Sequence, residues 1–207
     1  MKPEWKKSEK NFYLPRVKPE EIVIPRFKFF SVRGKGTPND DRFAEYIGVL
    51  YSLSYAIKMS PKTGIAPDNY HDYSVYPLEG VWDIDEDAKK TFTGNLDKNT
   101  FVFNLMIRQP DFVTMDYADE IIKRTQKKKP HNLLDQVKFE IIDEGYCIQM
   151  LHLGSYDNEP ESFQQMERFR EDRQLKRKSC MHREIYLTDA RKTSPEKLMT
   201  VLRFQVE

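Results

Sequence analysis

Cysteine is scarce in this chain of 207 residues, and the two present, Cys147 and Cys180, lie far apart in the sequence. Neither belongs to a CxxC pair or to a Cys and His spacing of the kind that binds zinc. A zinc site and a disulfide framework are therefore not expected, and we interpret both residues as ordinary thiols. The length alone is enough to bury roughly 70% of the unfolded surface without such cross-links.

Long apolar runs are also missing. The longest apolar stretch, from Ile47 to Ile57, falls far short of the ~20 residues that a membrane-spanning helix requires. The N-terminal residues MKPEWKKSEKNFYLP lack the apolar region of a signal peptide. We therefore expect a cytoplasmic protein that does not associate with a membrane.

An excess of one charge is absent, because 34 Lys and Arg face 33 Asp and Glu and leave a formal net charge of +1. A chain without a net field does not collect nucleic acid or anionic membranes by non-specific attraction. The short basic N-terminal arm also offers no plausible helix-turn-helix. We expect no nucleic-acid partner, and a stand-alone receptor or enzyme rather than a promoter-binding activator.

Motifs for metals and nucleotides are missing as well. None of the four histidines stands in an HExxH spacing or beside a nucleophile, and we interpret them as structural or surface residues. The GKG of Gly34 to Gly36 lacks the remaining residues of a dinucleotide or phosphate loop, and is typical of a turn. We expect no metal and no cofactor.

Aromatic residues, in contrast, are plentiful: 11 Tyr, 13 Phe and 2 Trp make up 13% of the chain. Large rings that fill a modest core explain most of the Phe, since each buries about 150–250 Å². Tyr and Trp also carry a polar group that needs a partner, and they are often placed where one end stays wet.

The first half of the chain predicts a strand, helix, strand, strand unit. Residues 1–25 are charged and interrupted by proline, which indicates an extended arm. A β-rich run over 26–34 ends in a turn, where Asn39 or Asp40 can cap a helix over 41–59 with apolar residues at helical spacing. Two further strands are expected over 72–83 and 101–109, joined by the polar stretch 84–100.

The second half repeats this order after a connecting helix over 114–129, whose basic end suits the helix dipole. We expect a hairpin of KFEIID and YCIQMLHLG around Glu144 and Gly145, a helix over 161–176, and strands from HREIYLTD and LMTVLRFQVE. The predicted fold class is α+β, with one antiparallel-sheet domain over 26–207 and a central cleft between two pseudo-twofold-related units. The first predicted unit covers 26–110, the connecting helix 111–130, and the second predicted unit 131–207.

Several segments, in order, resemble the GyrI-like small-molecule-binding family, which is related to the effector-binding domains of multidrug-responsive transcription activators. They are SVRGKGTPN, VLYSLSYAIKM, YPLEGVW, LMIRQPDFVT, LHLGSYDNEPESF and HREIYLTDARKTSPEKLMTVLR, and they span most of residues 22–206. The chain departs from the family pattern at Gly154-Ser155-Tyr156 and at Trp82-Asp83. The resemblance implies SHS2-like units and an aromatic pocket with a glutamate for planar, apolar or cationic compounds. In some members it also implies hydrolysis of cyclopropane-bearing alkylating toxins.

Glu184 is the acid that the resemblance matches to the pocket glutamate. Strand alternation from His182 to Leu187 places Glu184 and Tyr186 on one face, and Arg183 and Ile185 on the other. In an arbitrary strand this arrangement would put Glu184 in solvent; in a pocket its carboxylate would serve as a base or as a counter-charge for a cation.

The remaining candidate ligand-binding residues are Tyr51, Tyr55, Trp82, Phe103 and Tyr186, and simple core filling is the alternative for the rings. Tyr51 and Tyr55 lie one helical turn apart on one face, and rings beside an acid suit planar cations. We expect xenobiotic sequestration, with Glu184-assisted hydrolysis by water as a further activity, in a monomer or weak homodimer. The alternative is a protein-interaction module that resembles a gyrase inhibitor, with an exposed sheet edge.

Overall fold

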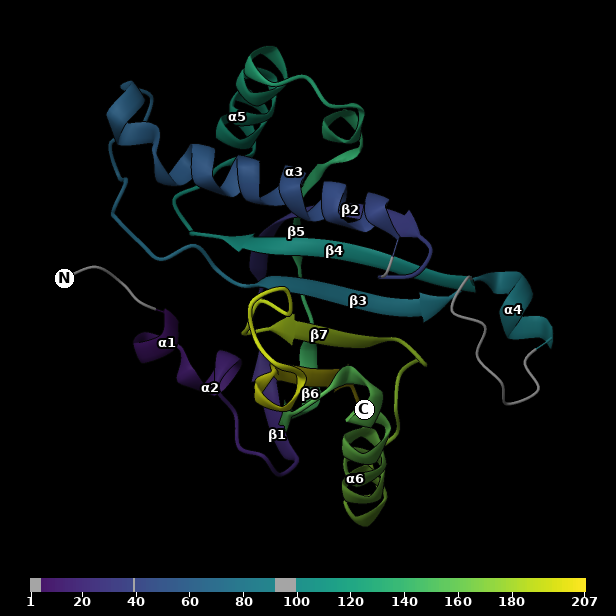
Figure 1. Ribbon diagram of the computed structural model, residues 1–207. Coiled ribbons are helices and arrows are strands. Elements are labelled where there is room, and N and C mark those ends of the chain that lie inside the picture. Colours follow the sequence, from purple (N-terminus) through teal and green to yellow (C-terminus); the bar gives the residue numbers. More distant parts are fainter. Residues whose placement is uncertain (1–4, 39, 92–99) are drawn as a thin grey trace. The chain divides into compact units, whose positions relative to one another are not determined.

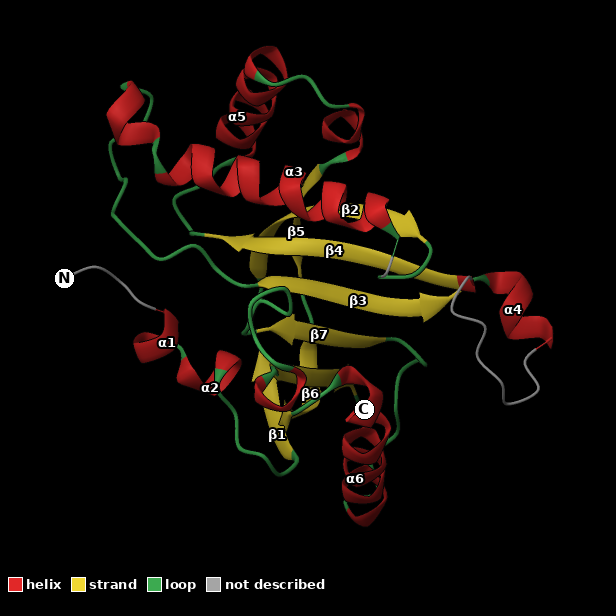
Figure 2. Cartoon of the chain, viewed as in Figure 1, coloured by secondary structure: helices red, strands yellow, loops and turns green. Residues whose placement is uncertain are grey.

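The computed structural model describes residues 5–38, 40–91 and 100–207, which form two compact units. In the described chain, unit 1 holds residues 27–78 and 82–142, and unit 2 holds residues 5–26, 79–81 and 143–207. Both units combine helices with antiparallel strands (Figures 1 and 2). The predicted α+β class is therefore confirmed, while the pseudo-twofold relation and the central cleft stay predictions.

Unit 1 is built on the long strand β2 (Phe27–Lys35), which pairs antiparallel with β4 (Phe101–Gln109) and with β5 (Lys138–Ile142). Helix α3 (Asp41–Lys58) packs against β2 and β4, and α5 (Met115–Lys128) packs against α3 (Figure 1). The described part of this unit also includes the short helices η1 (Ser60–Thr63), α4 (Glu86–Thr91) and η3 (Asn132–Gln136).

Helix α3 begins and ends where local chemistry predicts. The Asp40 carboxylate accepts a hydrogen bond from the Arg42 backbone amide at 2.9 Å and caps the first turn. The helix ends just before η1, which carries Pro61 in its first turn. Leu50, Leu53 and Ile57 are fully buried along its inner face, which confirms the predicted helix.

Unit 2 contains four strands in the order β1-β6-β8-β7, all antiparallel to their neighbours. Helix α6 packs against β6, and its Met166 joins a fully buried apolar cluster with Ile148 of β6 and Phe204 of β8. The strands are β1 (Glu20–Ile24), β6 (Gly145–Leu153), β7 (His182–Tyr186) and β8 (Met199–Gln205), and the helices are η4 (Tyr156–Asn158), α6 (Glu159–Asp172) and η5 (Pro195–Lys197).

Strand β3 (Leu78–Ile84) has residues in both units. It is shorter than predicted, because the segment before Leu78 has no regular structure from Tyr70 onward. Part of the polar stretch predicted after it, residues 92–99, lies outside the described residues, as does the alternative cap Asn39.

The predicted hairpin of KFEIID with YCIQMLHLG is wrong. Strand β5 pairs with β2 inside unit 1, from Phe27 opposite Ile142 to Ser31 opposite Lys138. Strand β6 pairs instead with β1 and β8 in unit 2. Only residues 143 and 144 separate β5 from β6, yet the two strands belong to different units. Gly145, the first residue of β6, has a φ of 67°, a conformation that is also typical of a tight hairpin turn.

The extended N-terminal arm is also wrong in its local structure. Residues Trp5–Ser8 form α1, Lys10–Tyr13 form α2, and β1 pairs with β6. Trp5 and Tyr13 are buried, with ring centroids 5.1 Å apart, so the segment contributes apolar surface to unit 2.

Candidate functional site

Strand β7 holds the predicted acid in the predicted orientation. Arg183 and Ile185 are buried on one face of the strand, while Glu184 and Tyr186 share the other. The Tyr186 hydroxyl donates a hydrogen bond to Glu184 Oε2 at 2.7 Å, and His182 Nε2 lies 3.0 Å from Glu184 Oε1. The alternation predicted from the sequence is therefore confirmed.

The Glu184 side chain is only 12% exposed, so the alternative in which it points into bulk solvent is wrong. A carboxylate withdrawn from water is stabilised when polar groups bond to its oxygens. Tyr186 and His182 each supply one such contact, one to each oxygen. The Glu184 carboxylate is thus largely buried, and its two polar partners fix its orientation.

A second carboxyl group, which the sequence analysis did not identify, lies in the electrostatic neighbourhood of Glu184. Glu159 is the first residue of α6, is 8% exposed, and its Oε1 has no hydrogen-bond partner within the described part of the chain. Burial, and then the charge of Glu184, raise the pKa of Glu159 to about 9. The raised pKa favours the protonated, neutral form of Glu159 at neutral pH.

The sequence did not single out Glu159 because of its position in the helix. An acid in the first turn of a helix, here followed by Pro160, is ordinarily explained by the helix dipole, which favours an anion there. Only its burial beside the charge of another carboxylate distinguishes it, and neither property can be derived from the local sequence.

Two tyrosines and a phenylalanine complete the surroundings. The rings of Tyr156 and Tyr186 pack edge to face with centroids 6.1 Å apart, and the rings of Phe163 on α6 and His182 pack with centroids 4.7 Å apart. Tyr156 is 37% exposed, so its burial is only partial. This partial burial, followed by the charges of Glu159, Glu184 and Asp189, raises the pKa of Tyr156 to about 12, so its hydroxyl keeps its proton. We name these six residues the Glu184 cluster: Tyr156, Glu159, Phe163, His182, Glu184 and Tyr186.

His152 anchors the turn that carries Tyr156 and Glu159. Its Nδ1 lies 2.9 Å from Ser162 Oγ on α6, and its Nε2 lies 3.0 Å from the Ser155 carbonyl oxygen. Because a carbonyl only accepts, Nε2 carries the proton and Ser162 donates to Nδ1. The buried imidazole thus joins β6 to η4 and to the first turn of α6, which confirms its interpretation as a structural histidine.

Four of the five predicted aromatic residues lie in unit 1, and the fifth, Tyr186, lies in unit 2. Trp82 and Phe103 are buried with ring centroids 5.4 Å apart, and Phe43 lies 5.9 Å from Trp82 and 5.2 Å from Phe103. On α3, Tyr51 and Tyr55 lie 6.2 Å apart, and Tyr55 is 53% exposed. Their shared helix face is confirmed, whereas a common ligand site with Glu184 stays a prediction.

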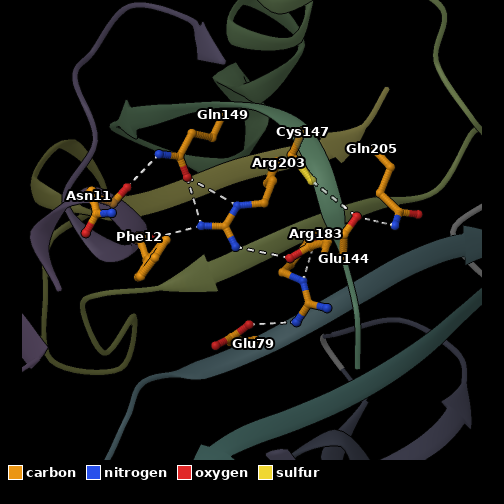
Figure 3. A network of polar contacts seen from close by, with 9 residues as sticks. All are labelled: Asn11, Phe12, Glu79, Glu144, Cys147, Gln149, Arg183, Arg203 and Gln205. Atoms are coloured by element: carbon orange, nitrogen blue, oxygen red, sulfur yellow. Dashed lines mark hydrogen bonds and ion pairs between the residues drawn. The ribbon is translucent and has the colours of Figure 1, made fainter. Parts of the chain in front are cut away.

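A buried ionic network lies on the inner side of β7 (Figure 3). Arg183 donates to Glu144 at 2.9 Å and to Glu79 at 2.6 Å, and Arg203 donates to Glu144 at 3.1 Å. Burial opposes ionisation of Glu144, but both arginines outweigh it and lower the pKa of this carboxyl. Burial prevails at Glu79 and raises its pKa against the attraction of the arginines.

This network also ties the N-terminal helices to the sheet of unit 2. Arg203 Nη2 donates to the Phe12 carbonyl at 2.7 Å, and Gln149 Nε2 donates to the Asn11 carbonyl at 2.7 Å (Figure 3). Gln149 Oε1 in turn accepts from Arg203 at 2.8 Å. The charged groups of the network thus bond to other groups within the protein, and we assign the network a structural role.

Among the described residues, no group of three or more His, Cys, Asp or Glu side chains is placed to hold a metal ion. In the same part of the chain, no helix combines the length and the apolar composition needed to cross a membrane.

The α+β fold and the sequence together match a recognised family of small-molecule-binding domains. The chain belongs to the GyrI-like family, because the GyrI-like small molecule binding domain matches residues 18–207. The resemblance predicted from the sequence segments is thereby confirmed.

Two solved structures from Listeria innocua resemble the chain over 100% of both lengths. One is an uncharacterized conserved protein, 37% identical with a TM-score of 0.90, and the other is a hydrolase, 36% identical with a TM-score of 0.88. The EcmrR C-terminal domain shares the fold at 13% identity, with a TM-score of 0.57 over 92% of this chain and 97% of that domain. A comparison with curated proteins gave no match.

Proposed function

We propose that this protein binds small cationic or apolar organic molecules at the Glu184 cluster, with Glu184 as the counter-charge for a ligand cation. The observation that carries the proposal is the Glu184 carboxylate, which is 12% exposed and bonded to Tyr186 and His182. The rings of these two partners in turn contact the rings of Tyr156 and Phe163. An acid with aromatic neighbours attracts a planar cation through both charge and ring faces. Membership in a small-molecule-binding family supports it.

Calorimetric titration with N-methylacridinium, a planar cation, and with acridine, its neutral analogue at pH 7.5, tests this proposal. Glu184→Gln keeps the size of the side chain and removes the charge, so we expect the cation to lose about 2–5 kcal/mol of binding free energy. Acridine should lose little. Glu161→Gln is the matched control, because Glu161 lies two residues beyond Glu159 on α6 and is exposed. Equal losses for both ligands would contradict the role of Glu184 as a counter-charge.

We also propose a hydrolytic activity toward strained, cyclopropane-bearing alkylators. Glu184 takes a proton from water as the water oxygen forms a bond to a ring carbon, and the strained carbon–carbon bond breaks. The released electron pair moves into the conjugated carbonyl, whose oxygen is stabilised by a Tyr or Trp donor and finally receives a proton, so that one water is added. The specific support is the fixed Glu184 carboxylate and the 36%-identical hydrolase from Listeria innocua.

Incubation with a cyclopropane-bearing alkylator, followed by mass spectrometry, tests the hydrolysis. We expect a product heavier by one water, formed about 10²–10⁴-fold more slowly by Glu184→Gln, because that variant lacks the base. Glu161→Gln should match the parent protein. If the product forms at the same rate with all three proteins, or at the same rate as in buffer alone, the proposed hydrolysis is wrong. The binding proposal would not be affected, because calorimetry tests it separately.

A further inference from the structure

The Glu184 cluster contains one more acid than a site for a single cation needs. Glu184 has a polar partner on each oxygen, whereas Glu159 Oε1 has none within the described part of the chain, although the side chain is 8% exposed. A buried carboxyl group without partners is tolerated when it is neutral and is costly when it is ionised. The resting arrangement of Glu159 thus suits a protonated acid.

We propose that Glu159 is a second ligand-responsive acid, which is neutral in the free protein and releases its proton when a cationic ligand enters the Glu184 cluster. This inference rests on the proposed binding function and extends it to a coupling between cation binding and proton release. Burial, and then the charge of Glu184, keep Glu159 protonated in the free protein. A cation beside the two carboxyls offsets the repulsion from Glu184 and attracts an ionised Glu159, which opposes the effect of burial. The remaining attraction favours an ionised Glu159.

Titratable groups on the neighbouring elements are alternative sources of the proton. From η4, the Tyr156 hydroxyl, with a pKa raised to about 12, stays protonated in this range, and Asp157 is exposed. From β6, His152 has both ring nitrogens bonded. From β7 and the loop that follows it come His182, Glu184, Tyr186 and Asp189, of which Asp189 is paired with Arg191. His182 is the main rival, because a cation that pairs with Glu184 also repels a protonated imidazole.

The coupling fixes the direction of the pH dependence. Free Glu159 holds its proton up to about pH 9, and the proton leaves at lower pH in the complex. Affinity for a permanent cation should therefore rise with pH by up to about tenfold per unit, and become constant above about pH 9. A neutral ligand should show no such rise, because it leaves the repulsion between the two acids unchanged.

The proton count is measured by calorimetry with N-methylacridinium at pH 7.5, in phosphate and in Tris, whose ionisation enthalpies differ. The difference between the two observed enthalpies gives the number of protons released. We expect a release approaching one proton for the parent protein and for Glu161→Gln, and none for Glu159→Gln. A full release that persists in Glu159→Gln, or no release from the parent protein, would overturn the inference. If the proton release persists in Glu159→Gln but disappears in His182→Gln, the proton comes from the His182 imidazole instead.

A spectroscopic measurement on the parent protein serves where Glu159→Gln fails to fold. Infrared difference spectra at pH 7.5 should show loss of the protonated-carboxyl C=O band when N-methylacridinium binds, and no loss when acridine binds. Binding of the cation without loss of this band overturns the inference alone. Failure of the parent protein to bind the cation at any pH overturns the proposed function, and the proton coupling with it.

Discussion

Glu159 experiences two opposing effects on one carboxyl group. The positive end of the α6 dipole favours its ionised form by about 0.3–1 kcal/mol, as for any acid in a first turn. Burial and the charge of Glu184 oppose it and prevail, since the pKa of Glu159 rises to about 9. The helix terminus thus supplies an ordinary position for an acid, and the surrounding fold changes its protonation.

Glu159→Gln should change how stability depends on pH. Between its ordinary pKa of 4.5 and a folded pKa of about 9, the folded protein binds more protons at Glu159 than the unfolded chain. The free energy of unfolding should therefore fall as pH rises through this window, by up to about 1.4 kcal/mol per unit. The variant should lose this fall, which urea unfolding at pH 5, 7 and 9 measures. Parallel curves for Glu159→Gln and the parent protein would mean that Glu159 ionises normally.

Among the strands, β2 and β4 use a glycine to admit a ring. Gly34 lies opposite Phe103 in the register of these strands, and a Cβ on Gly34 would stand 2.4 Å from two atoms of the Phe103 ring. The side chain of Tyr46 from α3 lies 3.0 Å from the same point. Residue 34 is thus kept free of a side chain by the packing of Phe103 under α3.

Gly34→Ala should destabilise the protein by about 1–3 kcal/mol, because Phe103 has to move inside a packed aromatic group. Gly48→Ala is the matched control: it lies in the interior of α3 with no atom within 4 Å of the added Cβ. That change should stabilise by about 0.5–1 kcal/mol through helix propensity. Urea midpoints of both variants test the pair, and destabilisation of equal size in both would refute this account of Gly34.

The elements that could be predicted from the sequence are those with local signals. Helix α3 has a capping aspartate and an apolar stripe, α5 has a basic end, and β7 has strict alternation, and these local signals predict all three elements. The pairing of β5 with β2 could not be, because residues 138–142 and 27–31 are joined only through the tertiary fold. The same holds for the site, where Glu184 was found by alternation and family resemblance, whereas Glu159 acquires its role only from burial.

The buried Arg and Glu network connects distant parts of unit 2. Glu79, Glu144, Arg183 and Arg203 come from four separate segments, and each is at most 8% exposed. Breaking one side of such a network leaves the remaining charges buried without compensation, whereas the intact network contributes less than its contacts suggest. Its effect is therefore largest when a single partner is removed.

Glu144→Gln should lower the free energy of unfolding by about 3–5 kcal/mol at pH 7, because Arg183 and Arg203 then lose their shared anion. The lowered pKa of Glu144 also determines how its contribution to stability changes at low pH. Its stabilisation is complete above its ordinary pKa of 4.5 and is lost as pH falls through the lower folded pKa. Urea unfolding at pH 7 and pH 3 should show the difference between variant and parent shrinking in acid; a difference that grows would contradict an ionised Glu144.

The N-terminal segment lies outside the family match, which begins at residue 18, yet it belongs to the folded core of unit 2. Tyr13 is 2% exposed against Trp5, and the carbonyls of Asn11 and Phe12 accept hydrogen bonds from Gln149 and Arg203. A chain of residues 18–207 should therefore unfold at a lower urea concentration than the full chain. Tyr13→Ala alone should cost about 3–5 kcal/mol, as expected for a buried ring.

Tyr55→Ala is the control for this comparison, since Tyr55 is 53% exposed and its removal should change stability far less. The expected order of urea midpoints is the parent protein and Tyr55→Ala highest, and Tyr13→Ala and the shortened chain well below. Because Arg203 also bonds to Glu144, loss of the Phe12 carbonyl should loosen the ionic network as well. The shortened chain should then respond less to Glu144→Gln than the full chain does. Additive losses, or a shortened chain as stable as the parent, would show that the segment rests on unit 2 without supporting it.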